Sequence, residues 1–371
     1  MKITFDEQAP QDAQNTHNAL PKVSNNQQPI VVAAGPTKDV EPREDAFDEP
    51  LLQDVEGKRY TFFPIPEAQQ ALYEYYKLHR STFWSVEEVD LTGDRDDFQK
   101  LSPPEQHFLK TTLAFFASSD VIVADNLVSN FMNDCPWSMV QLFYGFQRMM
   151  EDIHSEQYGL LIEALILDPK EKAVLFDAIN QVPCVKEKAE WVLNFMDRET
   201  VPYVERLVAF ALFEGVAFSS SFASVFFLRE KHPGLLKGLV FSNELISRDE
   251  SLHAEFAVHL FNNHIVHKPS VERMHEIVAS LLSVERNFVL NALPTSLIGL
   301  SPVLMIKYVE FTADQLMERM HYPPLYNHSK CPLQVMTSIS VATKTNFFEA
   351  RNASYSMSDA GSQKFVESDD F

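Results

Sequence analysis

The sequence contains two Glu-x-x-His pairs, Glu151/His154 and Glu250/His253, each set within a long apolar pattern of helical period. Residues three apart on a helix share a face, so each pair can direct a carboxylate and an imidazole at one point. A buried ionised carboxylate costs several kcal/mol unless an opposite charge compensates it. Carboxylate and imidazole ligands without thiolate suit iron or manganese. The two pairs therefore indicate a buried metal site.

The spacing alone is weak evidence, because it occurs four times, at 151/154, 250/253, 272/275 and 318/321. Helical position separates these pairs. The first two lie on the apolar stripes of their helices. Glu272 instead points away from the apolar face of its helix, and Glu318 stands at a helix end before two prolines. We therefore interpret the last two pairs as solvated helix surface.

Two further carboxylates complete the constellation. Asp120 lies in an apolar helical run that precedes the first pair, and Glu214 lies among phenylalanines in the run that precedes the second. The number of residues between Asp120 and Glu151, and between Glu214 and Glu250, suits two long antiparallel helices that carry both acidic groups near their middles. Four carboxylates and two imidazoles around two metal ions form the dimetal site of ferritin-like bundles. The predicted metal ligands are Asp120, Glu151, His154, Glu214, Glu250 and His253.

The elements that must position these residues are helices. Apolar patterns of helical period cover roughly 67–82, 103–130, 138–167, 170–180, 186–197, 202–229, 236–263, 270–290 and 302–320, and prolines separate several of them. No hairpin pattern interrupts the series. We predict an all-α fold, a ferritin-like helical bundle over residues 46–350. Residues 1–45 are predicted to be a disordered arm and 351–371 a flexible tail.

Composition narrows the possible functions. The 371 residues are 45% hydrophobic, with 29 Phe and only 10 Gly, which favours a large helical core over Gly-rich nucleotide loops. The net charge of −21 argues against nucleic acid or an anionic membrane as a partner. Three cysteines without paired spacing indicate a reducing, cytoplasmic compartment. We expect neither a membrane span nor a signal peptide.

The motifs resemble the small, radical-generating subunit of class I ribonucleotide reductase. The resemblance rests on FFASSDVIVADNL (115–127), FYGFQRMMEDIHSEQYGLLI (143–162), FEGVAFSSSFASVFF (213–227) and FSNELISRDESLHAEF (241–256), and it extends from about residue 50 to the C terminus. Gln147 places the sequence nearer to the eukaryotic-like branch. The family's metal ligands fall on the six residues that helix geometry selects.

The resemblance also implies roles for residues outside the metal set. The family's radical tyrosine falls on Tyr158, and its pocket residues fall on Phe218, Phe222 and Ile246. Its radical-export residues fall on Trp84, Asp249 and, in the tail, Tyr355. The acidic end FVESDDF resembles the peptide that docks on the large subunit.

The resemblance implies an oxidoreductase subunit of ribonucleoside-diphosphate reductase. A dimetal centre activated by O2, with iron expected and Mn/Mn or Mn/Fe as alternatives, would generate a tyrosyl radical. That radical would pass to the large (alpha) subunit, which reduces ribonucleotides to deoxyribonucleotides. The family is usually homodimeric. Two other functions fit the metal ligands alone: a stand-alone dimetal oxidase or oxygenase of the same fold, and a metal-storage bundle.

Overall fold

We describe the protein from a computed structural model, which places residues 49–54, 62–297 and 299–337. This part of the chain is built from helices and has no strand, only an isolated bridge between Leu297 and Leu300. The predicted all-α fold is thereby confirmed. The predicted N-terminal arm and C-terminal tail lie outside the described residues.

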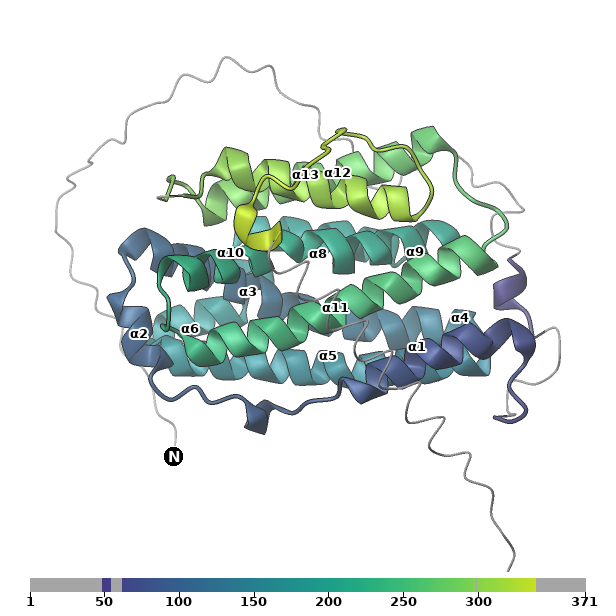
Figure 1. Ribbon diagram of the computed structural model, residues 1–371, viewed down its shortest axis with the longest axis horizontal. Helices are drawn as coiled ribbons and strands as arrows, with labels where there is room; N and C mark the ends of the chain where they lie inside the picture. Colours follow the sequence, from purple (N-terminus) through teal and green to yellow (C-terminus); the bar gives the residue numbers. More distant parts are fainter. Residues whose placement is uncertain (1–48, 55–61, 298, 338–371) are drawn as a thin grey trace, which may run out of the picture. The chain divides into compact units, whose positions relative to one another are not determined.

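The principal helices follow one another through short connections (Figure 1). They are α1 (Gln70–Ser81), α2 (Asp94–Lys100), α3 (Pro103–Asn126), α4 (Met132–Asp134), α5 (Ser138–Leu165), α6 (Pro169–Phe176), α7 (Ala178–Gln181), α8 (Pro183–Phe195), α9 (Tyr203–Leu212), α10 (Ser219–Lys231), α11 (Lys237–His264), α12 (Val271–Ala292) and α13 (Pro302–Arg319). Two π-helical segments, η5 (Leu127–Phe131) and η6 (Phe213–Ala217), join α3 to α4 and α9 to α10. Three short 3-10 turns occupy Pro50–Leu52, Glu67–Gln69 and Val86–Glu88.

Prolines and capping residues explain where several helices begin. Pro103, Pro169, Pro183 and Pro302 each occupy the first position of a helix, where a missing backbone N–H costs nothing. Ser102 and Glu105 form a capping box at the start of α3. Of the prolines that predict breaks in the sequence, Pro169 and Pro183 begin helices, while Pro136, Pro233 and Pro269 lie in the connections between them.

The bundle core is formed by the four elements that carry the predicted metal ligands. In Figure 1, α11 runs along the bundle against both α5 and α9, while α3 packs on α5 from behind. Helix α1 lies against α5 and α11, and α12 and α13 cover the opposite side over α8 and η6. Two stretches, Pro103–Asp134 and Tyr203–Lys231, are long and apolar enough to cross a membrane, but most of their residues are buried within this core. Their apolar character matches their buried position in the bundle.

The structure departs from the sequence prediction at two kinds of place. The runs 103–130 and 202–229, predicted as continuous helices, each contain a π-helical turn. A π turn accommodates one extra residue in the helix, and such turns are frequent at functional sites. Helix α2 is a short acidic helix that hydrophobic periodicity does not predict.

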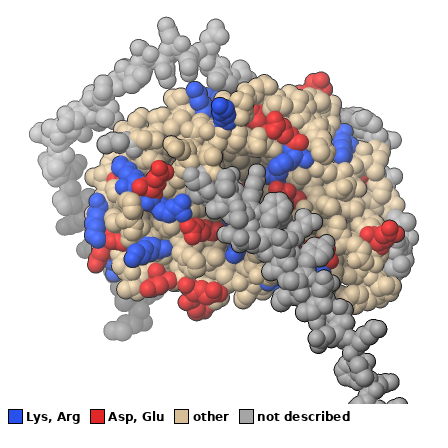
Figure 2. Space-filling view, in the orientation of Figure 1, with Lys and Arg blue, Asp and Glu red and all other residues tan. Residues whose placement is uncertain are grey.

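Charge on the surface is mixed. Figure 2 shows Lys and Arg interspersed with Asp and Glu over the described part of one face, so no single basic patch dominates it.

Candidate metal centre

The two Glu-x-x-His pairs face each other from antiparallel segments of α5 and α11. Glu151 and His154 lie on α5, Glu250 and His253 on α11, and none is more than 2% exposed. The three-residue spacing places each pair on one helix face, as expected. The interior position of both pairs follows from the apolar stripes that surround them.

The two remaining acidic residues approach from other helices. Asp120 lies on α3 and is fully buried, while Glu214 lies in the π-helical segment η6 and is 2% exposed. The potential ligand atoms form two groups in which all atoms lie within 4.8 Å of one another. Glu151 belongs to both groups. One consists of Glu151, Glu214, Glu250 and His253, and the other of Asp120, Glu151 and His154.

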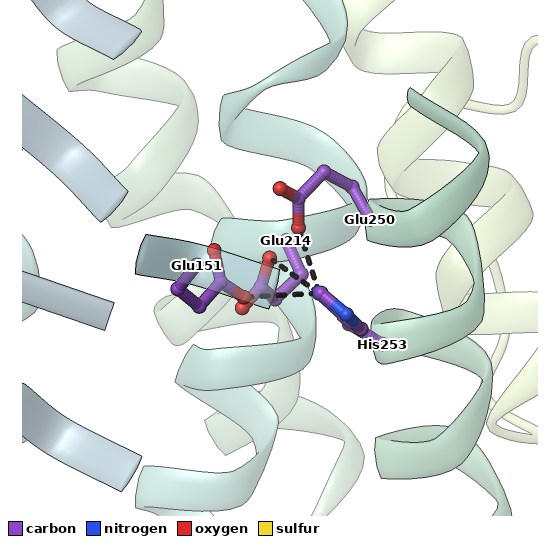
Figure 3. A group of neighbouring side chains, drawn as sticks. All are labelled: Glu151, Glu214, Glu250 and His253. Carbon is purple, nitrogen blue, oxygen red and sulfur yellow. Dashed lines mark hydrogen bonds and ion pairs between the residues drawn. The ribbon is translucent and has the colours of Figure 1, made fainter. Parts of the chain in front are cut away.

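Figure 3 shows the first group, in which three carboxylates converge on the His253 ring. The His253 Nδ1 atom lies 3.0 Å from Glu151 Oε1, 3.0 Å from Glu250 Oε2 and 4.0 Å from Glu214 Oε2. His154 has the same orientation, with Nδ1 3.0 Å from Glu250 Oε1 and 3.4 Å from Glu151 Oε2. Both rings therefore present Nδ1 to the cluster and turn Nε2 outward.

The buried carboxylates of the cluster need a nearby positive charge to stay ionised. Burial, followed by repulsion from neighbouring carboxylates, holds the pKa of Asp120 and of Glu214 well above the usual range. Both Asp120 oxygens and one oxygen each of Glu151, Glu214 and Glu250 are buried without a hydrogen-bond partner in the described part of the chain. Two divalent cations would oppose four carboxylates and take up these lone pairs. The oxygen and nitrogen donor set thus fits two metal ions such as iron or manganese.

Tyr158 lies one turn beyond His154 on α5 and is 1% exposed. Its ring stacks on Phe116, with centroids 4.4 Å apart and an interplanar angle of 4°. Its hydroxyl has no hydrogen-bond partner among the described residues. Burial, then the nearby charge of Asp120, raises the pKa of this phenol well above its usual value. The Tyr158 hydroxyl therefore keeps its proton, and the ring lies in an apolar pocket beside the acidic cluster.

The sequence prediction did not include the ring that stacks on Tyr158. The stacking partner of Tyr158 is Phe116, while Phe218 and Phe222 pack on Phe116 at centroid distances of 5.8 and 5.0 Å. Ile246 is buried on α11, one turn before Glu250. Phe116 is missed by sequence reasoning, although its place one turn before Asp120 was a usable signal.

Trp84 and Asp249 connect the cluster to the side of the bundle where α1 ends. The Trp84 indole N–H donates to Asp249 Oδ2 at 2.8 Å, and the same oxygen lies 3.3 Å from His154 Nε2. The Trp84 ring also stacks near His154, at 6.0 Å and 19°. Arg248 bonds the other Asp249 oxygen at 3.0–3.1 Å. Trp84 and Asp249 are both buried. Trp84, Asp249 and His154 thus form a continuous hydrogen-bonded chain.

The two other Glu-x-x-His pairs lie on the surface, as predicted. Glu272 and Glu318 are exposed, and neither belongs to a group of potential metal ligands among the described residues. The His275 ring contacts the Pro323 carbonyl, and His321 has a left-handed backbone just after α13. Tyr355 and the C-terminal peptide lie outside the described residues.

Two further polar residues at the cluster were not predicted as part of the site. The Gln147 amide donates to Glu151 Oε1 and Glu214 Oε1, each at 3.3 Å, and so links the two helices that carry these ligands. His79 on α1 lies 3.1 Å from the outward Nε2 of His253. Burial, then the adjacent His253, holds the pKa of His79 well below its usual value. The sequence contains one indication that His79 is buried, since it lies seven residues after the apolar Leu72 and so on the same face of α1.

Comparison with known proteins gives one consistent result. Residues 59–332 match the family described as "Ribonucleotide reductase, small chain". The sequence is 46% identical over 308 residues to human ribonucleoside-diphosphate reductase subunit M2, covering 83% of this chain and 77% of that protein. It is 45% identical over 313 residues to the Trypanosoma brucei brucei small chain, covering 84% and 91%. The structure resembles that of the Saccharomyces cerevisiae Rnr4 homodimer, with a TM-score of 0.69, 31% identity and coverage of 81% and 94%.

Proposed function

The chain belongs to the family of ribonucleotide reductase small chains, and we propose that it stores an oxidising equivalent as a radical on Tyr158 for delivery to a large subunit. The large subunit would use that equivalent to reduce ribonucleotides to deoxyribonucleotides. The proposal rests above all on one observation. A buried set of four carboxylates and two imidazoles lies beside a tyrosine that is enclosed by phenylalanines.

The metal ligands proposed are Asp120, Glu151, His154, Glu214, Glu250 and His253. Two redox-active ions bound there would supply O2 activation and an oxidant strong enough to oxidise a phenol. We propose iron as the resident metal, with Mn/Mn and Mn/Fe centres as alternatives. Anomalous scattering at the iron and manganese edges, on protein purified without added metal, identifies the ions.

Tyr158 is suited to hold the radical because of its surroundings. Loss of one electron together with the hydroxyl proton leaves a neutral phenoxyl, the form that an apolar pocket tolerates best. The stacked Phe116 and the buried position exclude water and reductants from the ring. The hydroxyl has no hydrogen-bond partner among the described residues, so its proton would have to pass to a carboxylate of the cluster, of which Asp120 acts most strongly on the phenol.

Trp84 and Asp249 provide the proposed route by which the radical leaves. Asp249 accepts the indole hydrogen bond and also supports His154, so it couples Trp84 to the cluster through two contacts. Tyr355 would be the last stepping stone, and residues 351–371 would dock on the large subunit. A stand-alone oxidase or a storage bundle needs neither an export route nor a docking peptide, so the hydrogen-bonded chain favours the reductase.

The export proposal is tested with the chain, its large subunit, Fe(II), O2 and a ribonucleoside diphosphate. We expect a truncation after residue 350 to retain the radical and lose deoxyribonucleotide formation. A synthetic peptide of residues 365–371 should inhibit the full-length complex, and a scrambled peptide should not. Full turnover by the truncated chain would refute docking through the tail. We also propose that the working protein is cytoplasmic and forms a homodimer. Sedimentation of the holoprotein measures the number of subunits.

A further inference from the structure

His79 is a buried histidine on α1 that makes one polar contact with the metal centre. Its Nε2 lies 3.1 Å from His253 Nε2, and the two rings meet at 4.8 Å and 65°. Phe143 and Phe146 enclose the His79 ring at centroid distances of 5.1 and 4.8 Å. The side chain is 0% exposed, and its Nδ1 has no partner among the described residues. Among the described residues, no other polar side chain contacts the outward nitrogen of His253.

The direction of this hydrogen bond follows from the orientation of His253. Its Nδ1 faces Glu151, Glu214 and Glu250, so this nitrogen is the one available to a metal ion. A neutral imidazole that binds metal through one nitrogen carries its proton on the other. His253 must then donate through Nε2–H, and His79 Nε2 must present its lone pair. The two rings can form only one such bond, which fixes the tautomer of both.

The same outward position on the other histidine ligand is occupied by a carboxylate. Asp249 Oδ2 lies 3.3 Å from His154 Nε2 and also accepts from Trp84. His79 stands only five positions before Trp84, at the end of α1. One short segment therefore supports both histidine ligands, His253 directly through His79 and His154 indirectly through Trp84 and Asp249.

We propose that His79 is a positioning residue for the metal centre: its Nε2 accepts the hydrogen bond of His253 Nε2–H and holds His253 Nδ1 toward the metal. This inference rests on the proposed function, since it assumes that His253 binds metal. Partners of this kind orient metal-bound histidines, and their loss typically lowers metal affinity about 10–100-fold. A phenyl cage around His79 keeps the acceptor in place, because the ring cannot turn away without displacing Phe143 or Phe146.

The test is a titration of the metal-free full chain with Mn(II), in which free Mn(II) is measured by EPR. The variants are His79→Leu, which removes the acceptor, and His79→Gln, whose amide oxygen can accept the same bond. His259→Leu is the matched control, because His259 is a half-buried histidine of α11 that contacts Tyr75 and lies outside the cluster. Thermal unfolding of each metal-free variant reports any general damage to the bundle.

We expect the wild-type chain and His259→Leu to bind two Mn(II) ions with the same affinities. His79→Leu should weaken one of the two positions about 10–100-fold, and His79→Gln should recover most of the loss. Unchanged binding by His79→Leu, or equal losses in His79→Leu and His79→Gln, would overturn the role of the hydrogen bond. Failure of the wild-type chain to bind two ions would instead refute the proposed dimetal function, so the two failures are distinguishable.

Discussion

Lys188 forms a buried ion pair whose removal should strongly destabilise the protein. The Lys188 ammonium lies 2.6 Å from Glu285 Oε1 and donates to the Ala217 carbonyl at 2.7 Å, and both charged side chains are at most 1% exposed. It also sits 3.4 Å from the centroid of the Phe115 ring. Burial lowers the pKa of Lys188 and raises that of Glu285, which shows how costly each charge would be alone.

The magnitude follows from what Lys188→Met leaves behind. Among the described residues, Glu285 would keep only its bond from Ser220. Breaking a buried pair by removing one partner costs about 3–5 kcal/mol. The Ala217 carbonyl, at the end of the π-helical segment that carries Glu214, would also lose its ammonium donor. Replacing both charges, in Lys188→Met/Glu285→Leu, should recover part of the loss because no unpaired charge remains.

Urea unfolding of the metal-free chain, followed by far-UV circular dichroism, measures these differences in the free energy of unfolding. Lys186→Met is the matched control, since Lys186 lies on the same helix in an exposed pair with Glu190 at 3.7 Å. Its loss should cost less than about 1 kcal/mol. If Lys188→Met cost no more than this control, or if the double variant were less stable than Lys188→Met alone, the buried ion pair would not have the stabilising role inferred from its contacts.

Two further predictions concern single residues. A Cβ on Gly238 would lie 2.4 Å from the Asp90 carbonyl oxygen, so Gly238→Ala should lower the free energy of unfolding by about 1–3 kcal/mol. A Cβ on Gly159 would meet nothing within 4 Å, so the control Gly159→Ala should instead raise the free energy of unfolding slightly. For Glu105, burial alone would raise the pKa, but hydrogen bonds led by that from Lys231 outweigh it and lower the pKa to about 2. Its stabilising contribution is therefore complete above the usual pKa of 4.5 and is lost as pH falls toward 2. The stability difference between wild type and Glu105→Gln should shrink over that interval in acid titrations, and a difference that grows on acidification would contradict the assignment.

The cluster of carboxylates and histidines was predictable because helix periodicity alone brings its members to interior faces. A three-residue spacing inside an apolar stripe joins Glu151 to His154 and Glu250 to His253. Asp120 lies on the same kind of stripe. These features are local, so a single sequence contains them. The same periodicity separated the buried pairs from the exposed ones.

The support around the cluster was not predictable from local pattern. Whether His79 meets His253, and whether Lys188 meets Glu285, depends on how distant helices pack. The π turn around Glu214 was also missed, because an extra residue in a helical turn leaves the apolar composition of the run unchanged. Such features become visible only when the helices are assembled.

EPR after addition of Fe(II) and O2 to the metal-free chain tests most directly whether Tyr158 holds the radical. We expect an organic radical signal that narrows when the protein contains ring-deuterated tyrosine. The signal should be absent from Tyr158→Phe, although that variant binds the same amount of iron. It should persist in Tyr144→Phe, which alters another fully buried tyrosine of α5. A tyrosyl signal that survives in Tyr158→Phe would show that the radical does not reside on Tyr158.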